Sequence, residues 1–536
     1  MARPHDLVET AFYTDERPLG AGPLRESCGP GAASSRAALM PLSPTGRRSR
    51  ARLVRFIHHL LGALAALALT ASGLPARAAM WDHAHEDATN SGFASVATLP
   101  ALRPLATVPG IGSYAPGAGP VIGPDGIVYL GSREGDLRAL RADGSLYWKR
   151  SLGLGQAILA SSVVDTDGSI YVVGVRSYTD HRVTPAVRRS ESRLYHFYPG
   201  GGLQWVILFP RHYASVPASA DNGETTAPPN IWRSGGNTAI MVPAVYRGRV
   251  SRDVRLLAFS PGGILLADRG VGSIVPQVFA EGPPHVSFCH GVSTTTPPDR
   301  LPAGTPIPMP GVAIFTFPGG GTPWIVATDQ VGTTVGWTFS IAGGFTEWSR
   351  KSRGGIVTTS PPMVLPDAHS VVGIQEQKFR VGCGFYDTGG YVTFGGPNGI
   401  PLSDVYLGLD TGVVAAPART ADSRIIVAHS YGFDVLRGSD KLQSVKYPGQ
   451  TIAAAAVSQT HIYISTAGSM RSYDVNTLAK VGEVAWFGGG QSSPAIGPSG
   501  RVYALASNVL FIWPGPTCPR WGCVPTPPGG VVNARP

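Results

Sequence analysis

One short pattern recurs along this chain and constrains its fold more than any other feature. Asp125–Tyr129 (DGIVY) returns as Asp167–Tyr171 (DGSIY), Gln459–Tyr463 (QTHIY) and Ser499–Tyr503 (SGRVY). Weaker apolar equivalents lie near Ile240, Ile325, Val372 and Ile426. From Tyr129 the successive steps are 42, 69, 85, 47, 54, 37 and 40 residues. The short steps match a four-stranded unit of about 40 to 50 residues, so the chain carries eight copies of one unit.

Each complete copy has a second half. Asp136–Trp148 is echoed by Arg193–Trp205 and by Val254–Leu265. Apolar positions that alternate around Asp-Gly or Pro-Gly-Gly predict two more antiparallel strands joined by a tight turn. Each unit therefore has four strands, and Trp148 and Trp205 are expected on the last strand, where they pack between neighbouring units.

A single four-stranded sheet cannot bury both of its faces, whereas copies stacked around an axis bury both, as in a β-propeller. The last copy, Ser493–Trp513, offers only about three strands. Ala97–Val108, which precedes the first full copy, can supply the fourth. We predict an all-β chain folded as an eight-bladed propeller, or a seven-bladed one if a middle copy is misread. Pairing of N- and C-terminal strands closes the ring.

Two steps of the period are too long and carry insertions. Val175–Glu191 is charged and polar, and Gly272–Met309 is rich in Pro, Thr and Gly. Both are expected to be loops on one rim of the disc. Because function on rigid scaffolds concentrates in variable loops, these two segments are the predicted contact surfaces.

The N-terminal region has the pattern of an export signal. Arginines precede the apolar run Leu60–Leu74, and Ala76-Arg77-Ala78 follows it, which predicts cleavage after Ala78. The run has 15 residues, short of the ~20 that span a membrane. We therefore divide the chain into 1–39 (a mis-assigned start or disordered), the signal 40–78, the propeller 79–516 and a Cys/Pro-rich tail 517–536. Both Sec and twin-arginine export stay open, and the protein is expected to be secreted or periplasmic.

Charge gives little support to a nucleic-acid partner. The formal net charge is +10, but half of that excess falls within residues 1–78. Lysine is scarce and the arginines of the rest are spread out, whereas nucleic-acid binding needs clustered basic and aromatic residues. We expect no nucleic-acid partner, no membrane span and a monomer.

The repeat resembles a known family. The pattern small-Pro-x-Ile-Gly-x-x-Gly-x-Val-Tyr, followed by Leu-x-Ala-Leu-x-x-Asp-Gly-x-x-x-Trp, is similar to the PQQ-like (quinoprotein-type) β-propeller repeat. The lead-in Trp81–Gly92 (WDHAHEDATNSG) also looks like that family's opening, with Trp81, Asp87, Asn90 and Gly92 in place. The resemblance runs from about Trp81 to Pro514, and the family is typically eight-bladed.

The resemblance does not bring catalysis with it. Quinoprotein dehydrogenases of this type carry a vicinal disulfide over the quinone, carboxylate and amide ligands for calcium, and an aspartate base. This sequence has no Cys-Cys pair, and no Glu, Asn and Asp set matches the calcium site. The resemblance therefore implies the non-enzymatic branch: exported scaffolds for protein or surface-glycan contacts, similar in fold to the lipoprotein of the outer-membrane barrel-assembly machinery.

Four cysteines follow the predicted cleavage point: Cys289, Cys383, Cys518 and Cys523. An even number in an exported chain favours disulfides. Cys518 with Cys523 is the obvious pair, worth roughly 2 kcal/mol by chain entropy. A disulfide between Cys289 and Cys383 would close a longer loop, would stabilise the fold by about 5 kcal/mol and would fasten the middle insertion to the next blade.

Several other groups have a plain structural reading beside a functional one. His83, His85, Glu86 and Asp87 could bind a metal, but we favour a role in tying the chain end to the disc. Asp165–Ser169 resembles half a calcium loop, yet position 12 is Arg176 rather than Glu, so a hairpin turn is preferred. In the aromatic-rich blade, Trp348 and the stretch Trp324–Phe339 could stack on a sugar or quinone, although inter-blade packing is the commoner use.

The sequence therefore predicts an exported β-propeller that acts as a binding or scaffolding module for a protein or glycan held at rim loops. No catalytic, cofactor-binding or metal residue is assigned. The alternative is a PQQ-dependent dehydrogenase with a degenerate quinone and calcium site.

Overall fold

The chain divides into two units, Met1–Leu74 and Pro75–Pro536. All residues described below belong to the second unit. The computed structural model describes residues 81–115, 118–181, 187–210, 223, 225–247, 252–274, 288–289, 292–293, 311–317, 322–329, 333–352, 356–380, 384–396, 401–408, 415–429, 432–447, 453–486 and 492–516. The predicted signal and the C-terminal tail lie outside these ranges.

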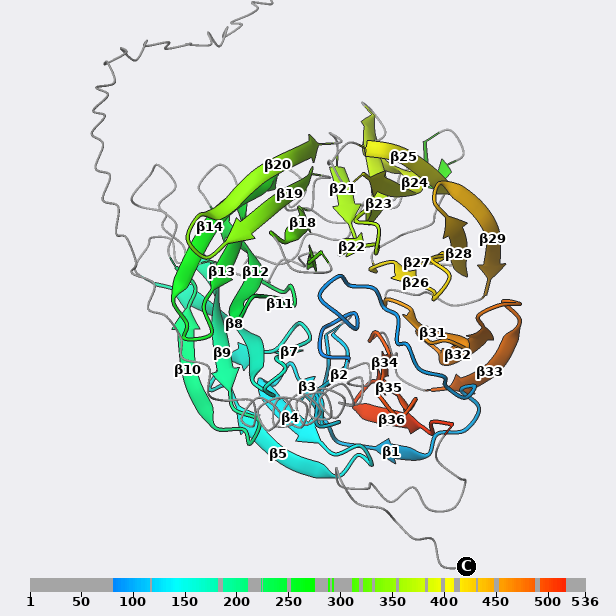
Figure 1. The fold of residues 1–536 in the computed structure, drawn as a ribbon, viewed down its shortest axis with the longest axis horizontal. Coiled ribbons are helices and arrows are strands. Elements are labelled where there is room, and N and C mark those ends of the chain that lie inside the picture. The colour runs from blue at the N-terminus through cyan, green and yellow to red at the C-terminus, as the bar shows by residue number, and fades with distance from the viewer. Residues whose placement is uncertain are drawn as a thin grey trace, which may run out of the picture. The chain divides into compact units, whose positions relative to one another are not determined.

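Every regular element in the described residues is a β-strand, and eight antiparallel sheets stand around one axis (Figure 1). Blade 1 holds β2 (Val121–Ile122), β3 (Val128–Gly131), β4 (Asp136–Leu140) and β5 (Leu146–Ser151). Blade 2 holds β6 (Gln156–Ala157), β7 (Val163–Val164), β8 (Ile170–Asp180), β9 (Val187–Phe197) and β10 (Leu203–Leu208). Blade 3 holds β11 (Asn230–Ser234), β12 (Asn237–Arg247), β13 (Arg252–Phe259) and β14 (Leu265–Ile274). Blade 4 holds β17 (Val312–Phe315), β18 (Trp324–Thr328), β19 (Thr333–Ser340) and β20 (Gly344–Ser352).

The second half of the ring continues in the same order. Blade 5 holds β21 (Ile356–Thr359), β22 (Met363–Val364), β23 (Ser370–Arg380), β24 (Gly384–Gly395) and β25 (Pro401–Gly408). Blade 6 holds β26 (Ala418–Arg419), β27 (Ile425–His429), β28 (Gly432–Arg437) and β29 (Asp440–Lys446). Blade 7 holds β30 (Ala456–Val457), β31 (His461–Ser465), β32 (Ser469–Asp474) and β33 (Lys480–Ala485). The predicted count of eight blades is confirmed.

The eighth blade joins the two ends of the described chain. It holds β34 (Ala495–Ile496), β35 (Val502–Ala506) and β36 (Val509–Trp513) from the C-terminal copy, with β1 (Ala106–Val108) as its outer strand. Ala106 pairs with Ile512 and Val108 with Leu510. The predicted seam is therefore confirmed, although only the last three residues of Ala97–Val108 form the strand.

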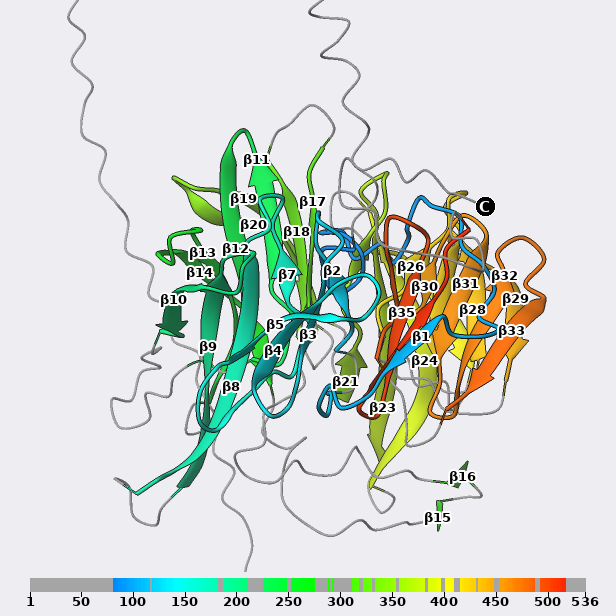
Figure 2. The same ribbon diagram turned by 90° about the horizontal axis from the view of Figure 1, so that it is seen from below.

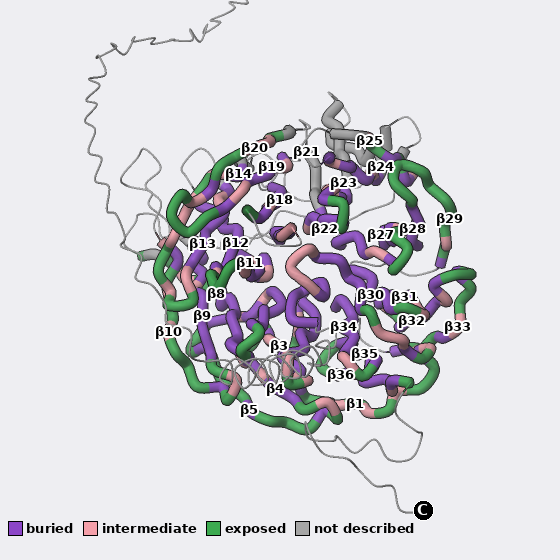
Figure 3. The backbone as a smooth tube through the Cα atoms, in the orientation of Figure 1, coloured by how far each residue is buried: buried purple, intermediate pink, exposed green. Residues whose placement is uncertain are grey.

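The repeated aromatic residues serve as inter-blade packing. Tyr129, Tyr171, Tyr463 and Tyr503 all lie buried on the second strand of a blade. The hydrophobic core runs between neighbouring blades, so Tyr129 of blade 1 shares a cluster with Val164 of blade 2. Figure 3 shows buried inner strands and exposed outer strands such as β29, because each sheet buries both faces except at its outer edge.

The insertion Val175–Glu191, which was expected to be a rim loop, is instead mostly paired strand. β8 and β9 stay in register from Ile170 with Phe197 to Asp180 with Val187. The polar composition misled the prediction, because a hairpin that projects into solvent needs no apolar face and can still satisfy its backbone by cross-strand pairing.

The second insertion, Gly272–Met309, lies mostly outside the described residues. Its first three residues end β14. Phe288–Cys289 (β15) pairs with Val292–Ser293 (β16) as a separate small hairpin. None of the described residues forms a helix long and apolar enough to cross a membrane.

Candidate functional site

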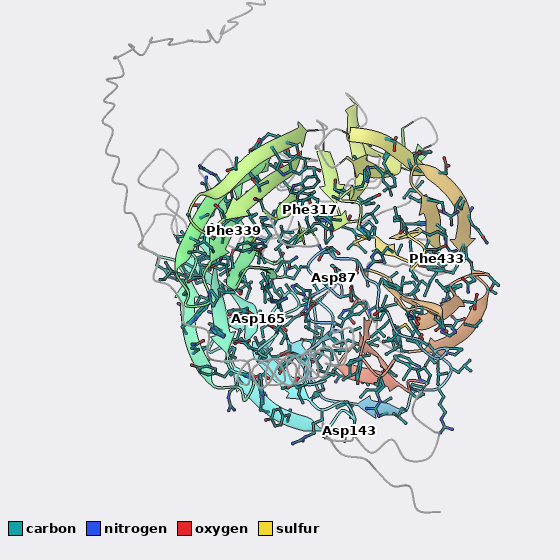
Figure 4. The ribbon with its side chains drawn as sticks, viewed as in Figure 1. Asp87, Asp143, Asp165, Phe317, Phe339 and Phe433 are labelled. Atoms are coloured by element: carbon teal, nitrogen blue, oxygen red, sulfur yellow. The ribbon has the colours of Figure 1, made fainter. Side chains whose placement is uncertain are left out.

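The segment Trp81–Ala94 lies at the axis of the ring, where Figure 4 places Asp87. Its backbone carbonyls accept hydrogen bonds from the inner strands in the order of the blades. Trp81, Asp82, Ala88, Thr89, Ser91 and Gly92 accept from the amides of Ile122, Val164, Ile314, Val364, Arg419 and Val457, at 2.6 to 3.0 Å. Those amides belong to blades 1, 2, 4, 5, 6 and 7, so this one segment holds six inner strands.

Two asparagine side chains complete this arrangement. Asn230 of blade 3 donates from Nδ2 to the carbonyls of Ala88 (2.9 Å) and Val312 (2.7 Å). Asn90 donates to the carbonyls of Val312 (3.2 Å) and Pro362 (2.8 Å). Asn90 has φ = +57°, a backbone conformation that Asn adopts more readily than most residues. We call the end of the ring at which Trp81–Ala94 binds the closed face.

The buried ionisable side chains of the same segment form hydrogen bonds with one another and with neighbouring hydroxyl groups. Nδ1 of His83 lies 2.5 Å from Oδ1 of Asp82. Ser91 donates from Oγ to Oε2 of Glu86 at 2.5 Å. Thr89 donates to Oδ1 of Asp87 from its amide (2.9 Å) and its hydroxyl (2.6 Å). These contacts stabilise a tight turn across the axis, in which the backbones of His83 and Glu86 form an isolated antiparallel β-bridge.

Burial governs the protonation of these groups. Burial and then the neighbouring Asp87 raise the pKa of Glu86 well above its usual value. Although burial opposes it, hydrogen bonds from Glu86, Thr89 and Ser91 lower the pKa of Asp87. Burial alone lowers the pKa of His85 to about 4. Burial therefore favours the protonated form of Glu86 and the neutral form of His85, whereas the hydrogen bonds favour the ionised form of Asp87.

The metal interpretation of His83, His85, Glu86 and Asp87 gains no support from this geometry. Within the described residues, no group of three or more His, Cys, Asp or Glu side chains could hold a metal ion. Asp165–Ser169 is a hairpin turn, with the Asp165 amide donating to the Ser169 carbonyl at 2.7 Å. Oδ1 of Asp165 accepts a hydrogen bond from Nε of Arg233 at 2.7 Å.

The same residues do not suit PQQ and calcium. The axis at the closed face holds Trp81–Ala94, whose backbone carbonyls bond to the blades and whose carboxylates bond within the segment. The described residues offer no group of three or more His, Cys, Asp or Glu side chains for calcium, and the sequence offers no adjacent cysteines. The described residues do not fit a quinone and calcium site, so we derive no catalytic step through one.

The opposite end of the ring is built differently. We call it the hairpin face: the far ends of β8–β9, β12–β13 and β23–β24, together with Gly153–Gly155. Figure 2 shows β8–β9 and β23–β24 projecting beyond the other blades on this side. A short extra strand supports each of these two hairpins, since β6 pairs with β8 and β21 pairs with β23. Neither extra strand was predicted from the sequence.

An exposed apolar residue stands at the root of the β8–β9 hairpin. Leu154 is 98% exposed and sits between Gly153 (φ = +106°) and Gly155 (φ = +72°). The next residue, Gln156, pairs with Arg176 of β8. The guanidinium of Arg176 lies over the ring of Tyr178, 5.9 Å from its centroid. The sequence analysis did not predict this group, although a leucine between two glycines, Gly153-Leu154-Gly155, could have indicated an exposed side chain.

The aromatic blade is mainly inter-blade packing. Trp337 and Phe339 are buried, and Phe339 packs edge-on against Trp232 of blade 3 at 5.1 Å between centroids. Trp324 and Trp348 are half-buried and tilt against each other at 5.3 Å. Figure 4 marks Phe317, which packs edge-on against Trp324 at 4.8 Å.

The cysteine predictions are not tested. Cys383, Cys518 and Cys523 lie outside the described residues, and Cys289 is described only as part of β15. Both pairings stay predictions.

Comparison with solved structures identifies the fold. The chain is similar to the quinohemoprotein alcohol dehydrogenase ADHIIG from Pseudomonas putida HK5, at 10% identity and TM-score 0.51, covering 84% of this chain and 82% of that one. It also matches the quinohemoprotein alcohol dehydrogenase from Comamonas testosteroni (10%, TM-score 0.44, 82% and 81% covered) and BamB from Moraxella catarrhalis (14%, TM-score 0.33, 74% and 82% covered). No protein-family model and no curated protein matches the sequence. The first similarity supports a PQQ-like propeller fold and nothing finer.

Proposed function

We propose that this chain is an exported binding module that holds a protein partner on its hairpin face. The observation that carries the proposal is the β8–β9 hairpin, which continues as paired strands to Asp180 and Val187. A paired hairpin is already ordered, so less conformational entropy is lost when it binds than for a flexible loop.

The side chains at the root of this hairpin suit a protein partner better than a glycan. Leu154, Arg176 and Tyr178 supply an apolar knob, a cation and an aromatic ring within one patch. Tyrosine and arginine are enriched among the residues that dominate protein interfaces. An apolar side chain that is 98% exposed gains hydrophobic free energy only when a partner covers it.

Export is part of the proposal and rests on the charged, apolar and small-residue order of residues 47–78. A protein outside the cytoplasm that offers a rigid ring and projecting hairpins is suited to hold another component of the cell envelope. No catalytic residue enters the proposal.

A shortened hairpin tests it. Residues 178–189 are replaced by Asn-Gly between Ser177 and Ser190, which are cross-strand partners, because Asn-Gly favours a two-residue hairpin turn. The mature chain is then cross-linked to partners in the envelope of the exporting cell, and captured protein is quantified. We expect the shortened chain to capture less than about a tenth of the amount held by the wild type, since removal of central interface anchors costs 2 kcal/mol or more.

A matched pair of leucine variants serves as the control. Leu154→Ser lies on the hairpin face, and Leu442→Ser on the outer strand β29 changes a leucine that is 50% exposed. Capture should fall with the first and stay unchanged with the second. Equal capture by the shortened chain and the wild type would overturn the proposal.

A further inference from the structure

The first residues that the structure describes are also among the most deeply buried. Trp81 is 1% exposed, Asp82 7% and His83 2%. Trp81 belongs to a hydrophobic cluster that includes Ile122 of blade 1 and Trp513 of blade 8. Strands from both ends of the described chain therefore enclose this tryptophan, so its full burial requires a closed ring.

The backbone is held at the same point. The Trp81 carbonyl accepts a hydrogen bond from the Ile122 amide at 2.7 Å, and the Asp82 carbonyl accepts one from the Val164 amide at 2.8 Å. Oδ2 of Asp82 also lies 3.9 Å from Nη2 of Arg233. Blades 1, 2 and 3 thus hold two consecutive residues, and Trp81 leaves its place only if several of these contacts break together.

The predicted cleavage point lies very near this anchored pair in the sequence. Only Ala79 and Met80 separate Ala78 from Trp81. The path of these residues lies outside the described part of the chain, but chain length sets a limit. Consecutive Cα atoms are about 3.8 Å apart, so the Ala78–Ala79 bond lies within about 11 Å of the Trp81 Cα atom on any path.

A protease needs more free chain than this. A peptide that enters a concave site in an extended conformation is bound over several residues, so residues on both sides of the scissile bond must leave the folded surface. Cleavage of a folded protein therefore follows the population of a locally opened form. At the Ala78–Ala79 bond, opening means that Trp81 leaves its cluster and that its carbonyl loses the Ile122 amide.

We propose that the signal segment is removed before Trp81 docks in the ring, and that the folded precursor is not a substrate for the signal peptidase. Water hydrolyses the Ala78–Ala79 peptide bond, which leaves a carboxylate on Ala78 and a free amino group on Ala79. The inference rests on the export signal of the proposed function and uses nothing at the hairpin face.

The same geometry distinguishes the two export routes that the sequence leaves open. The twin-arginine route carries proteins that have already folded, whereas the Sec route carries unfolded chains. A cleavage point that becomes inaccessible on folding suits a chain that crosses the membrane unfolded, because the peptidase then meets it while Trp81 is free. The expected route is Sec, with Arg47 and Arg48 acting only as positive charges of the signal.

The test compares cleavage of the same precursor before and after folding. The full chain, residues 1–536, is unfolded in urea and diluted into detergent, either together with purified signal peptidase or after it has folded. The product that begins at Ala79 is quantified by mass spectrometry. We expect the folded precursor to be cleaved at least about a hundredfold more slowly, because only its rare opened form is a substrate.

A linker variant separates reach from folding. Ten Gly and Ser residues are inserted between Met80 and Trp81, which leaves the residues around the scissile bond unchanged and adds about 30 Å of chain. The folded linker precursor should be cleaved within about threefold of the unfolded rate, because no opening is then required. The control carries the same insertion between Gly235 and Gly236, an exposed turn, and should stay resistant when folded. All three precursors should share one urea midpoint.

A second experiment tests the route in the exporting cell. Arg47→Lys together with Arg48→Lys keeps the positive charge and removes the arginine pair, so export through Sec should be unchanged. The amount of processed chain outside the cytoplasm measures it. A loss of export in this variant would assign the twin-arginine route and overturn the proposal.

Two results of the cleavage experiment would also overturn it. One is a folded precursor that is cleaved as fast as the unfolded one, and the other is a folded linker precursor that stays resistant. An unfolded precursor that is not cleaved after Ala78 would refute the export signal and this inference with it. Partner capture at the hairpin face is measured on the mature chain, so its outcome is independent of all three.

Discussion

The two ends of the ring are built to opposite plans. At the closed face, Trp81–Ala94 lies within the ring and its backbone bonds to one inner strand after another. At the hairpin face, β8–β9 extends ten residues past Ile170, and Leu154 stands almost fully in solvent. The same eight sheets therefore end in a buried hydrogen-bonded network on one side and in projecting hairpins on the other, where Arg176, Ser177 and Thr179 of β8 are exposed.

This difference separates stability from recognition. Substitutions at the closed face disturb several blades at once, because they leave buried donors or acceptors unpaired. Substitutions at the hairpin face touch one hairpin and mostly solvent, where changes are usually within ±0.5 kcal/mol.

The largest effect is expected at Gly92. Its φ is +57°, and a Cβ there would lie 2.7 Å from Cβ of Ala418 and 3.2 Å from the Ala455 carbonyl oxygen. Gly92→Val combines overpacking with a left-handed β-branched residue, so the free energy of unfolding should fall by about 4 kcal/mol. Urea denaturation measures it. The control is Gly126→Ala. Gly126 has φ = +75° and no atom within 4 Å of the added Cβ, so the free energy of unfolding should fall by only about 1 kcal/mol. An equal fall in both variants would refute the packing argument.

Protonation of His85 should cost stability in acid. Burial lowers the pKa of His85 to about 4 in the folded chain, against about 6.5 when unfolded. Between these values the unfolded chain binds the extra proton, so the contribution of His85 is full above pH 6.5 and falls by roughly 3 kcal/mol as the pH drops toward 4. The raised pKa of Glu86 acts in the opposite direction, so the contribution of His85 is read as the difference between wild type and His85→Gln. Denaturation midpoints of both proteins between pH 7 and 4 should show the wild type losing more stability than His85→Gln, and parallel curves would contradict this assignment.

A smaller effect is expected at Asn90. Asn90→Gly keeps the positive φ but removes both hydrogen bonds, to the carbonyls of Val312 and Pro362. Asn230 still donates to the Val312 carbonyl, so the main change is the lost hydrogen bond to the Pro362 carbonyl. We expect the free energy of unfolding to fall by about 2 kcal/mol. Asn476→Gly, at an exposed turn position, should cost less than about 1 kcal/mol. Equal losses would show that Asn90 does not hold blades 4 and 5 together.

The smallest change in stability is expected at the hairpin face. Leu154→Ser should alter the free energy of unfolding by less than about 0.5 kcal/mol, because the side chain is 98% exposed. The same variant should lose partner capture. Thermal unfolding checks the first expectation, and a loss of stability as large as that of Asn90→Gly would end the proposed division between the two faces.

The sequence predicted the ring well because its signal is repeated. Tyr129, Tyr171, Tyr463 and Tyr503 mark second strands that must bury both faces, so their apolar residues recur with the period of the blade. The seam followed from a count of strands, since Ser493–Trp513 lacked one and an unassigned stretch preceded the first copy. Even the weak copies near Ile240 and Val372 fall on second strands, β12 and β23.

Other features were beyond pattern reading. The far half of β8 is polar on both faces and carries no period, so its strand character was missed. Trp81–Ala94 was recognised as a lead-in, but its hydrogen bonds to six inner strands use backbone groups that any sequence possesses. Side-chain composition cannot report such backbone events.

The place of Trp81–Ala94 also sets an order of assembly. Gly92 bonds to Val457, the Thr98 amide donates to the Thr460 hydroxyl and β1 pairs with β36. These partners are synthesised several hundred residues later, 362 positions later for Thr98 and Thr460. A chain synthesised from its N-terminus presents residues 81–108 first and can dock them only when the last two blades have been made. Until then the inner strands have open edges, so the nascent chain depends on being kept apart from others of its kind.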